Sequence, residues 1–243
     1  WFGTVNGVAH FDGTTWAIYD STNSGLPGGV NEIAIDKDGS KWFTTQSGVV
    51  HFDGANWTVY NHANSGLPND AIISVAIDSN GMKWFGGYNV GEGVTTFDGT
   101  NWKNYNTGNS GLPSNWVQRI IIGPNGEKWF AAVNGGAAKF DGSNWTVYNT
   151  SNSGIVSNAI NSIAIDKNGN ELFGTTSGLS ILNNAAQNLP SINFLTLPFP
   201  YDPKMNIQQG WFYNFTPTSA KCTSTLPNPD NNPINNLNCG IDY

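Results

Sequence analysis

The pattern that decides the fold is clearest at residues 41–57, which read KWFTTQSGVVHFDGANW. A Trp-Phe pair opens this stretch, a Phe-Asp-Gly turn follows, and a second Trp closes it. The opening pair recurs at steps of 41 to 45 residues, as Trp1-Phe2, Trp42-Phe43, Trp84-Phe85 and Trp129-Phe130, with Leu172-Phe173 continuing the series. Self-similarity at such a period is typical of repeat architectures.

Each repeat is predicted to form four short strands. Apolar or β-branched runs of four to seven residues are separated by Gly, Asp, Asn and Pro, which favour turns. In the clearest unit we expect strands near 30–36, 41–45, 48–52 and 57–60, with the same offsets in later units. Four strands in about 42 residues indicate one blade of a β-propeller.

We therefore predict an all-β fold in which residues 1–182 form about five four-stranded propeller blades. The first blade is incomplete, because residues 1–19 supply three strands without an inner strand, and residues 160–182 give three strands of the last blade. Propellers close with four to eight blades. Either further blades precede Trp1 or the two ends complete one blade together, and the first is favoured because Trp1 lies inside the motif.

Composition excludes several functional classes. The formal net charge is -7 and Arg119 is the single arginine, so the basic face expected of a nucleic-acid binder is missing. No apolar run approaches the ~18–20 residues that span a bilayer. Aromatic residues make up 13% of the chain at regular spacing, which argues against disorder.

The repeat resembles the two-component-regulator propeller repeats. The resemblance rests on Trp-Phe-Gly-Thr, Phe-Asp-Gly and Ile-Ala-Ile-Asp followed by Lys-Trp-Phe, and it covers residues 1–182. Such repeats form β-propellers in the periplasmic sensor parts of bacterial hybrid kinases and in secreted bacterial proteins. The resemblance implies an exported protein, in the periplasm, at the cell surface or outside the cell. Ligands differ between family members, so it gives the fold with more force than the function.

Variation between the repeats indicates where a ligand would bind. The largest insertion, at residues 88–93, lies in the hairpin between the second and third strands. That hairpin shares a face with the connection into the next inner strand, where Trp116 replaces Gly or Ala and Arg119 replaces Glu or Ser. Because exposed loops on a rigid scaffold carry function, we expect a ligand site of Tyr88, Asn89, Glu92, Trp116 and Arg119. The alternative is that these residues are ordinary sequence variation within a repeat. In that case Arg119 would pair with an acid of a neighbouring blade.

Other candidate residues have structural explanations, and we expect neither a cofactor nor zinc in this chain. His10 and His51 share one repeat position, whereas a metal site needs convergent ligands. The turn at residues 36–39, Asp-Lys-Asp-Gly, resembles the start of a calcium loop, but its counterparts lose carboxylates, so an Asx-type turn is favoured and calcium is the alternative. The Trp, Tyr and Phe ladders are expected to pack between blades rather than to stack on carbohydrate.

The repeat stops after residue 182, and we expect a linker at 183–194 and an irregular C-terminal segment at 195–243. This segment, with its final NCGID, resembles the opening of a lysostaphin-like zinc metallopeptidase domain. In that family a His-x-Gly-x-Asp run supplies two zinc ligands and a later His-x-His completes the site. Asp242 matches the carboxylate ligand, but Asn238 stands where the histidine is required and no His-x-His follows. We therefore expect no catalysis by this chain.

The two cysteines, Cys222 and Cys239, lie 17 residues apart in this segment. In an exported protein we expect them to form a disulfide, which would stabilise the segment by roughly 3 kcal/mol. Two free thiols are the alternative.

Together these features predict a non-catalytic, exported β-propeller that binds a ligand or another protein, with a protein or glycan at the cell surface as its partner. Two alternatives stay open. One is an accessory propeller of a cell-wall metallopeptidase whose catalytic part is incomplete here. The other is a structural subunit of a surface assembly, because an incomplete blade has an unpaired edge and such edges recruit strands.

Overall fold

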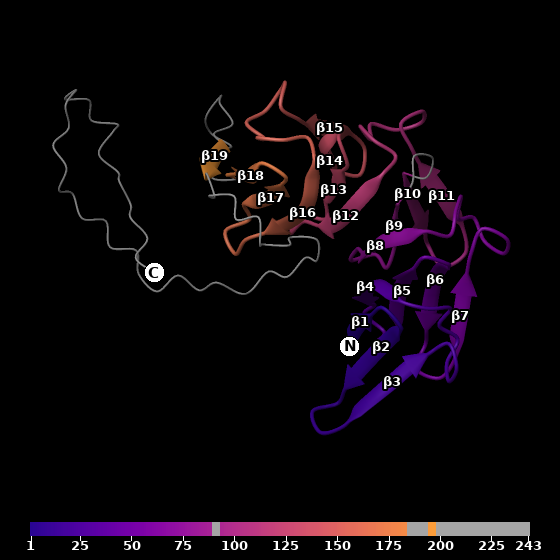
Figure 1. The fold of residues 1–243 in the computed structure, drawn as a ribbon. Helices are drawn as coiled ribbons and strands as arrows, with labels where there is room; N and C mark the ends of the chain where they lie inside the picture. Colours follow the sequence, from indigo (N-terminus) through magenta and orange to yellow (C-terminus); the bar gives the residue numbers. More distant parts are fainter. Residues whose placement is uncertain (89–92, 184–193, 198–243) are drawn as a thin grey trace, which may run out of the picture. The chain divides into compact units, whose positions relative to one another are not determined.

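The computed structural model describes residues 1–88, 93–183 and 194–197, and these residues form five antiparallel sheets (Figure 1). By its contacts the chain divides into residues 1–201 and 202–243, and every described strand belongs to the first unit. None of the described residues forms a helix long and apolar enough to cross a membrane.

Each sheet is a meander whose strands pair in chain order. The first sheet consists of β1 (Phe2–Thr4), β2 (Gly7–Phe11) and β3 (Trp16–Asp20). The second consists of β4 (Val30–Ile35), β5 (Lys41–Thr45), β6 (Gly48–Phe52) and β7 (Trp57–Tyr60). The third consists of β8 (Ile72–Ile77), β9 (Lys83–Gly87), β10 (Val94–Phe97) and β11 (Trp102–Tyr105). The fourth consists of β12 (Val117–Ile122), β13 (Lys128–Ala132), β14 (Gly136–Phe140) and β15 (Trp145–Tyr148). The fifth consists of β16 (Ile160–Ile165), β17 (Glu171–Thr175), β18 (Gly178–Leu182) and β19 (Phe194–Leu197).

The predicted all-β propeller fold is confirmed, with five blades of which the first lacks its inner strand. The inner strands contact one another in succession, β4 with β8, β8 with β12 and β12 with β16. In the second sheet the strands lie where the repeat predicts them, within one residue at each end.

One strand was not expected from the sequence. β19 pairs with β18, with Leu182 opposite Phe194 and Leu179 opposite Leu197, and it gives the fifth sheet its fourth strand. The connection before it is longer than in the other sheets and lacks the Phe-Asp-Gly turn that precedes each other outer strand. β19 begins at Phe194, the last residue of the linker expected at 183–194, and continues into the segment expected at 195–243.

The turn carboxylates of the repeat are occupied by local hydrogen bonds and ion pairs. Asp53 Oδ1 accepts hydrogen bonds from the backbone N–H groups of Ala55 and Asn56, at 2.8 and 2.7 Å. Asp36 pairs with Lys83 of the next sheet at 2.8 Å. These are the contacts of Asx-type turns and of blade-to-blade ion pairs.

The hydrophobic core lies between neighbouring sheets. The Trp42 ring of β5 lies 5.8 Å from the Phe85 ring of β9, between ring centroids, and the corresponding Trp84–Phe130 distance is 6.0 Å. Trp42 and Phe85 are both buried, and the Lys83 ammonium lies 5.4 Å from the Trp42 ring centroid. The aromatic ladders thus pack between blades, as the sequence predicts.

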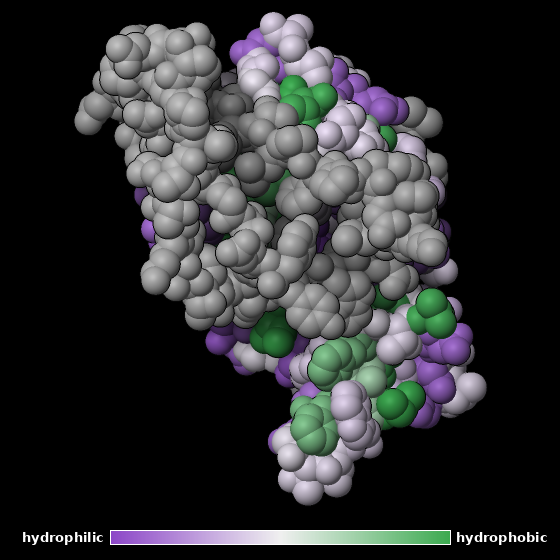
Figure 2. All heavy atoms as spheres, turned by 60° about the vertical axis from the view of Figure 1, so that its left-hand side comes forward, coloured by the Kyte–Doolittle hydropathy of each residue, from purple (hydrophilic) through white to green (hydrophobic). Residues whose placement is uncertain are grey.

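The first sheet exposes a face that its counterparts bury. Phe2 and Phe11 are 50% and 42% exposed, whereas Phe43 and Phe52, at the same repeat positions in the second sheet, are 0% and 8% exposed. Trp16 of β3 lies on this face as well and is 58% exposed. Figure 2 shows hydrophobic side chains at the lower end of the view, where the first sheet lies in Figure 1. Among the described residues, no neighbouring sheet packs on this apolar face.

Candidate functional site

The candidate site lies where the β9–β10 hairpin meets the connection that leads into β12. Gly93 in that hairpin donates its backbone N–H to the carbonyl oxygen of Asn115 at 2.7 Å. Within their own sheets, the N–H of Tyr88 reaches the carbonyl of Ala71 at 3.0 Å and the carbonyl of Trp116 accepts from Val133 at 2.9 Å. The third and fourth sheets are therefore joined by a backbone hydrogen bond beside both aromatic residues.

Tyr88 and Trp116 form an aromatic pair across this junction. Their ring centroids are 4.9 Å apart and the ring planes meet at 60°, an edge-to-face arrangement that aromatic rings favour. Tyr88 is 43% exposed and Trp116 is half-buried. The indole N–H of Trp116 is buried without an acceptor among the described residues. In the other repeats the position of Trp116 holds glycine or alanine, so this pair is particular to one junction.

Arg119 is held by an ion pair with Glu32. The guanidinium Nη1 contacts Glu32 Oε1, and the other carboxylate oxygen accepts the backbone N–H of Val75 at 2.8 Å. The side chains of Arg119 and Glu32 are 44% and 12% exposed. Burial raises the pKa of the Glu32 carboxyl above its ordinary value, and Arg119 beside it opposes that increase. The pair joins β4 to β12, with β8 between them.

A recurrent β-bulge brings these two residues to the same position of their strands. The pairing register shifts between Val30 and Glu32 in β4 and between Val117 and Arg119 in β12, and the same shift occurs in β8 and β16. A bulge turns the following side chain to a new direction. At this position Ser74 of β8 accepts the N–H of Ile120 at 2.9 Å, just as Glu32 accepts that of Val75. Arginine has no acceptor, so Arg119 interrupts this row and pairs with the acid instead.

The structure brings together only part of the predicted site. Tyr88 contacts Trp116. Arg119 pairs with an acid, as expected if the repeat has simply drifted at this position. That acid, Glu32, lies in the second sheet, whereas the sheet next to Arg119 is the third. Asn89 and Glu92 lie outside the described residues. Glu32 was not predicted to belong to the site, although it occupies the repeat position of Arg119 and was visible in the alignment of the repeats.

The other candidates from the sequence are either structural or outside the described residues. His10 stacks on Trp1 at a centroid distance of 4.3 Å, and His51 stacks on Trp42 at 4.4 Å. The described ranges hold no group of three or more His, Cys, Asp or Glu residues that could bind a metal ion. Four predicted tail residues lie outside the described residues, namely Cys222, Asn238, Cys239 and Asp242.

Comparison with known proteins shows that this chain resembles solved structures in its fold. No protein-family model and no curated protein matches the chain. Among solved structures, the chain is similar to the extracellular domain of BT3049 from B. thetaiotaomicron, described as a hybrid two component system. The identity is 24%, the match covers 82% of this chain and 27% of that one, and the TM-score is 0.68.

Two further structures extend this likeness. The extracellular domain of BT4673 from B. thetaiotaomicron, described as a one component system, is 19% identical, with 83% of this chain and 30% of that one covered and a TM-score of 0.67. PorZ, a surface component of the type-IX secretion system of Porphyromonas gingivalis, is 20% identical, with 78% and 32% covered and a TM-score of 0.61. Enzymes also occur among the similar structures, including a streptogramin B lyase.

The chain spans about a third or less of the length of the first three structures, 27% to 32%. The expected resemblance is thereby confirmed for the fold: the described part of the chain is a β-propeller similar to the extracellular propellers of two-component-type proteins.

Proposed function

We propose that this chain is a non-catalytic binding module of an exported protein, and that the Tyr88–Trp116 pair forms the centre of its binding surface. The observation that carries the proposal is the aromatic pair of exposed Tyr88 and half-buried Trp116, at one junction of an otherwise repeated scaffold. Large aromatic side chains contribute much of the energy at protein interfaces and at ligand sites.

Two observations support recognition rather than chemistry. The pair lies beside a backbone hydrogen bond that joins two sheets, so its position is fixed before a partner arrives, and a fixed surface loses little entropy on binding. The Arg119 guanidinium and the Glu32 carboxylate neutralise each other, and Glu32 also accepts a backbone N–H. This carboxylate is therefore engaged in structure rather than poised for proton transfer.

The partner we propose is a protein or a glycan at the cell surface. An edge-to-face pair presents one ring face and one ring edge, which suits an apolar side chain or the C–H face of a sugar ring. Export is supported by the extracellular and surface location of the similar structures named above. We place the protein outside the cytoplasm on that support.

A second candidate function is a structural subunit of a surface assembly. The apolar side chains of Phe2, Phe11 and Trp16 on the first sheet favour it, because a blade packed on them, from this protein or from another copy, would bury them as the other blades bury their counterparts. A second copy of the chain that covered this face would bury the same side chains. This function and the first use different surfaces and can be separated by mutation.

The test uses glycan and peptide arrays probed with the wild-type protein, with Trp116→Ala and with Trp16→Ala as the matched control for loss of an exposed tryptophan elsewhere. Binding should fall at least about tenfold in Trp116→Ala, the size of effect expected for a central aromatic residue. It should be unchanged in Trp16→Ala. If Trp116→Ala retained every array signal at full strength, while its circular dichroism and melting temperature showed a folded protein, the proposed site would be wrong.

A further inference from the structure

The inner edge of β1 is open. No described strand pairs with the side of β1 that faces away from β2, whereas in each of the other four sheets an inner strand occupies that side, namely β4, β8, β12 or β16. An unpaired edge presents a row of backbone N–H and C=O groups that can pair with another extended segment. The first sheet therefore offers a place for one more strand.

Three of the four inner strands end in the same sequence pattern. A residue with a side-chain oxygen is followed by Ile or Val and then by Ala, Ile and Asp, at residues 32–36, 74–78 and 162–166. In the second sheet this pattern places Ala34 opposite Trp42, and the apolar residue before it opposite Phe43. By that register, a segment of the same form on β1 would place its alanine opposite Trp1 and its apolar residue opposite Phe2.

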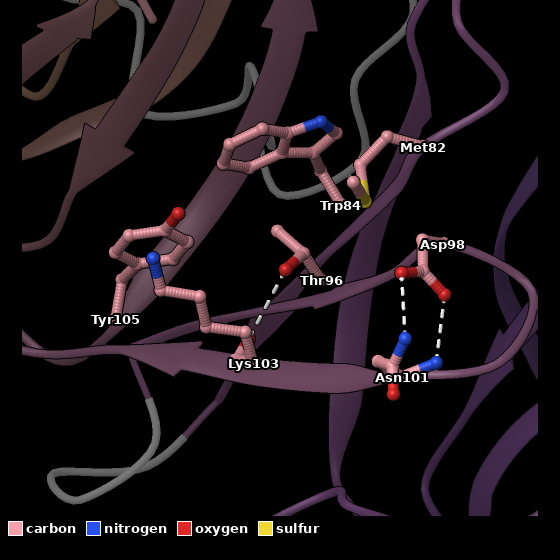
Figure 3. A pocket seen from close by; sticks show the side chains of 7 residues that line it. All are labelled: Met82, Trp84, Thr96, Asp98, Asn101, Lys103 and Tyr105. Carbon is pink, nitrogen blue, oxygen red and sulfur yellow. Dashed lines mark hydrogen bonds between the residues drawn. The ribbon is translucent and has the colours of Figure 1, made fainter. Parts of the chain in front are cut away.

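The two aromatic residues beside this edge are less covered than their counterparts. Phe2 is 50% exposed and Trp1 is half-buried, whereas Trp42 and Trp84, at the position of Trp1, are 3% and 4% exposed. Trp84 is this well covered even though it lines a cavity of about 310 Å³, where Met82 lies beside its indole (Figure 3). In both complete sheets the alanine of the inner strand belongs to the cluster around the tryptophan. An added strand would give the first sheet the same cover.

An ion pair joins the end of an inner strand to the next sheet at two junctions. The Lys83 ammonium lies 2.8 Å from Asp36, which follows β4, and 5.4 Å from the Trp42 ring centroid. Lys128 repeats this arrangement with Asp78, at 2.9 Å, and with the ring centroid of the tryptophan in the third sheet, at 5.2 Å. At both junctions the lysine of one sheet thus contacts the tryptophan and the terminal aspartate of the preceding sheet.

Lys41 of the second sheet has only half of this arrangement. Its ammonium lies 5.4 Å from the ring centroid of Trp1 in the preceding sheet. None of the ion pairs among the described residues involves Lys41. The aspartate that the repeat places here would come from an inner strand on β1. Lys41 is therefore a positive group positioned for the acidic end of a segment bound at this edge.

A backbone N–H group near the edge lacks its counterpart in the same way. Glu32 accepts the N–H of Val75 in the next inner strand at 2.8 Å. Ser74 accepts the N–H of Ile120 at 2.9 Å. The residue of β4 at the same position is Ile33, and no side chain of the described residues accepts its N–H. The first residue of the pattern carries the side-chain oxygen that would do so.

We propose that the inner edge of β1 binds an unpaired, extended peptide segment of this pattern, with its aspartate paired to Lys41. The segment adds a strand through backbone hydrogen bonds, and its side chains lie opposite Trp1 and Phe2. The inner strands of a second folded copy are already paired within their own sheets, so the occupant is a segment that is not part of a complete blade. The chemistry of this edge is the same whichever polypeptide supplies the segment.

This edge is separate from the Tyr88–Trp116 surface. β1 belongs to the first sheet, whereas Tyr88 and Trp116 lie at the junction of the third and fourth sheets. Strand addition at β1 therefore goes beyond the function proposed above, and either can fail without the other.

The test is fluorescence anisotropy of a labelled peptide with the sequence of residues 160–166, Ile-Asn-Ser-Ile-Ala-Ile-Asp, titrated with the full chain. We expect saturable binding that falls at least about tenfold with Lys41→Met, because a charge in a largely buried pair loses its partner. Lys37→Met, the matched control for loss of an exposed lysine in the same sheet, should bind as the wild type does. A peptide with proline in place of its alanine should not bind, because proline removes a backbone donor.

Charge reversal locates the peptide on the edge. Lys41→Glu should weaken the binding of the original peptide at least about tenfold, and a peptide that ends in lysine should bind this variant better than it binds the wild type. Circular dichroism and the melting temperature show that each variant is folded. No saturable binding, equal binding of the proline peptide, or no recovery on charge reversal would overturn the proposal. So would a dimer of the wild type in sedimentation that the peptide does not dissociate, because a second copy would then cover the edge.

Discussion

Arg119 shows how a single residue changes the chemistry of one position in a repeat. In β8 this position holds Ser74, whose oxygen accepts an N–H from the next inner strand. The arginine has no oxygen to offer, and its charge is matched instead by Glu32, a buried carboxylate at the same position of β4. The charge of Glu32 is therefore tolerated in part because Arg119 is present.

This dependence predicts a pH-dependent loss of stability in Arg119→Met. Burial already raises the pKa of Glu32 above its ordinary value of 4.5, so the folded state loses stability as pH rises and the carboxyl ionises. Without the arginine that loss should grow. We expect the variant to be less stable by about 1–2 kcal/mol at pH 8, less than for a fully buried pair because Arg119 is partly exposed.

Thermal or urea unfolding at pH 4 and pH 8 measures this effect, with Glu32→Gln and the double variant completing the cycle. The penalty should shrink at pH 4, where Glu32 is protonated, and it should largely disappear in the Glu32→Gln background. An equal penalty at both pH values would mean that Arg119 acts through packing and not through its charge.

At the scale of the strand pair, the hairpins depend on glycines whose backbone has a positive φ. Gly48 has a φ of 117°, and a Cβ atom added there would lie 2.2 Å from the carbonyl oxygen of Tyr60 in the outer strand. Gly54 has a similar φ of 107°, but a Cβ atom there would meet nothing within 4 Å. A side chain at Gly54 would therefore cause backbone strain alone, whereas a side chain at Gly48 would add a steric clash to that strain.

We therefore expect Gly48→Ala to cost more stability than Gly54→Ala. The second substitution should cost about 1 kcal/mol, the strain of an L-residue at positive φ, and the first about 2–4 kcal/mol because strain and displacement of β7 combine. Chemical denaturation of both variants measures the difference. Equal costs would show that the outer strand moves away without resistance.

The strands that the sequence predicted correctly are those that carry the full repeat. In the first four sheets a Trp-Phe pair and a Phe-Asp-Gly turn fix the register, because side chains alternate between faces and a shift of one residue would expose the ladder. β19 has neither signal, since Phe194 follows a longer connection and no Phe-Asp-Gly turn. Its pairing with β18 depends on contacts made only in the folded chain.

The candidate sites were predictable to a smaller extent. Tyr88 and Trp116 could be chosen because they depart from the repeat on the face that varies in length. Glu32 could not, because its repeat position gives no information that β4 and β12 come within reach across β8.

At the scale of the whole molecule, the repeat supplies the scaffold and the departures from it supply the surfaces. The aromatic ladders pack between the sheets, and the Lys83–Asp36 and Lys128–Asp78 ion pairs, at 2.8 and 2.9 Å, join the second sheet to the third and the third to the fourth. Such a scaffold holds a binding surface in place without needing the partner. The Tyr88–Trp116 surface and the apolar face of the first sheet belong to different sheets, so a footprint can tell them apart.

The most direct test of the central claim is hydrogen exchange of the wild-type protein, with and without the strongest ligand from the arrays. We predict that the ligand slows exchange in the β9–β10 hairpin and in the connection through Trp116 into β12, and that Trp116→Ala removes this protection. Protection that appears without ligand, rises with protein concentration and is confined to β1–β3 would contradict the claim and favour self-assembly through the first sheet.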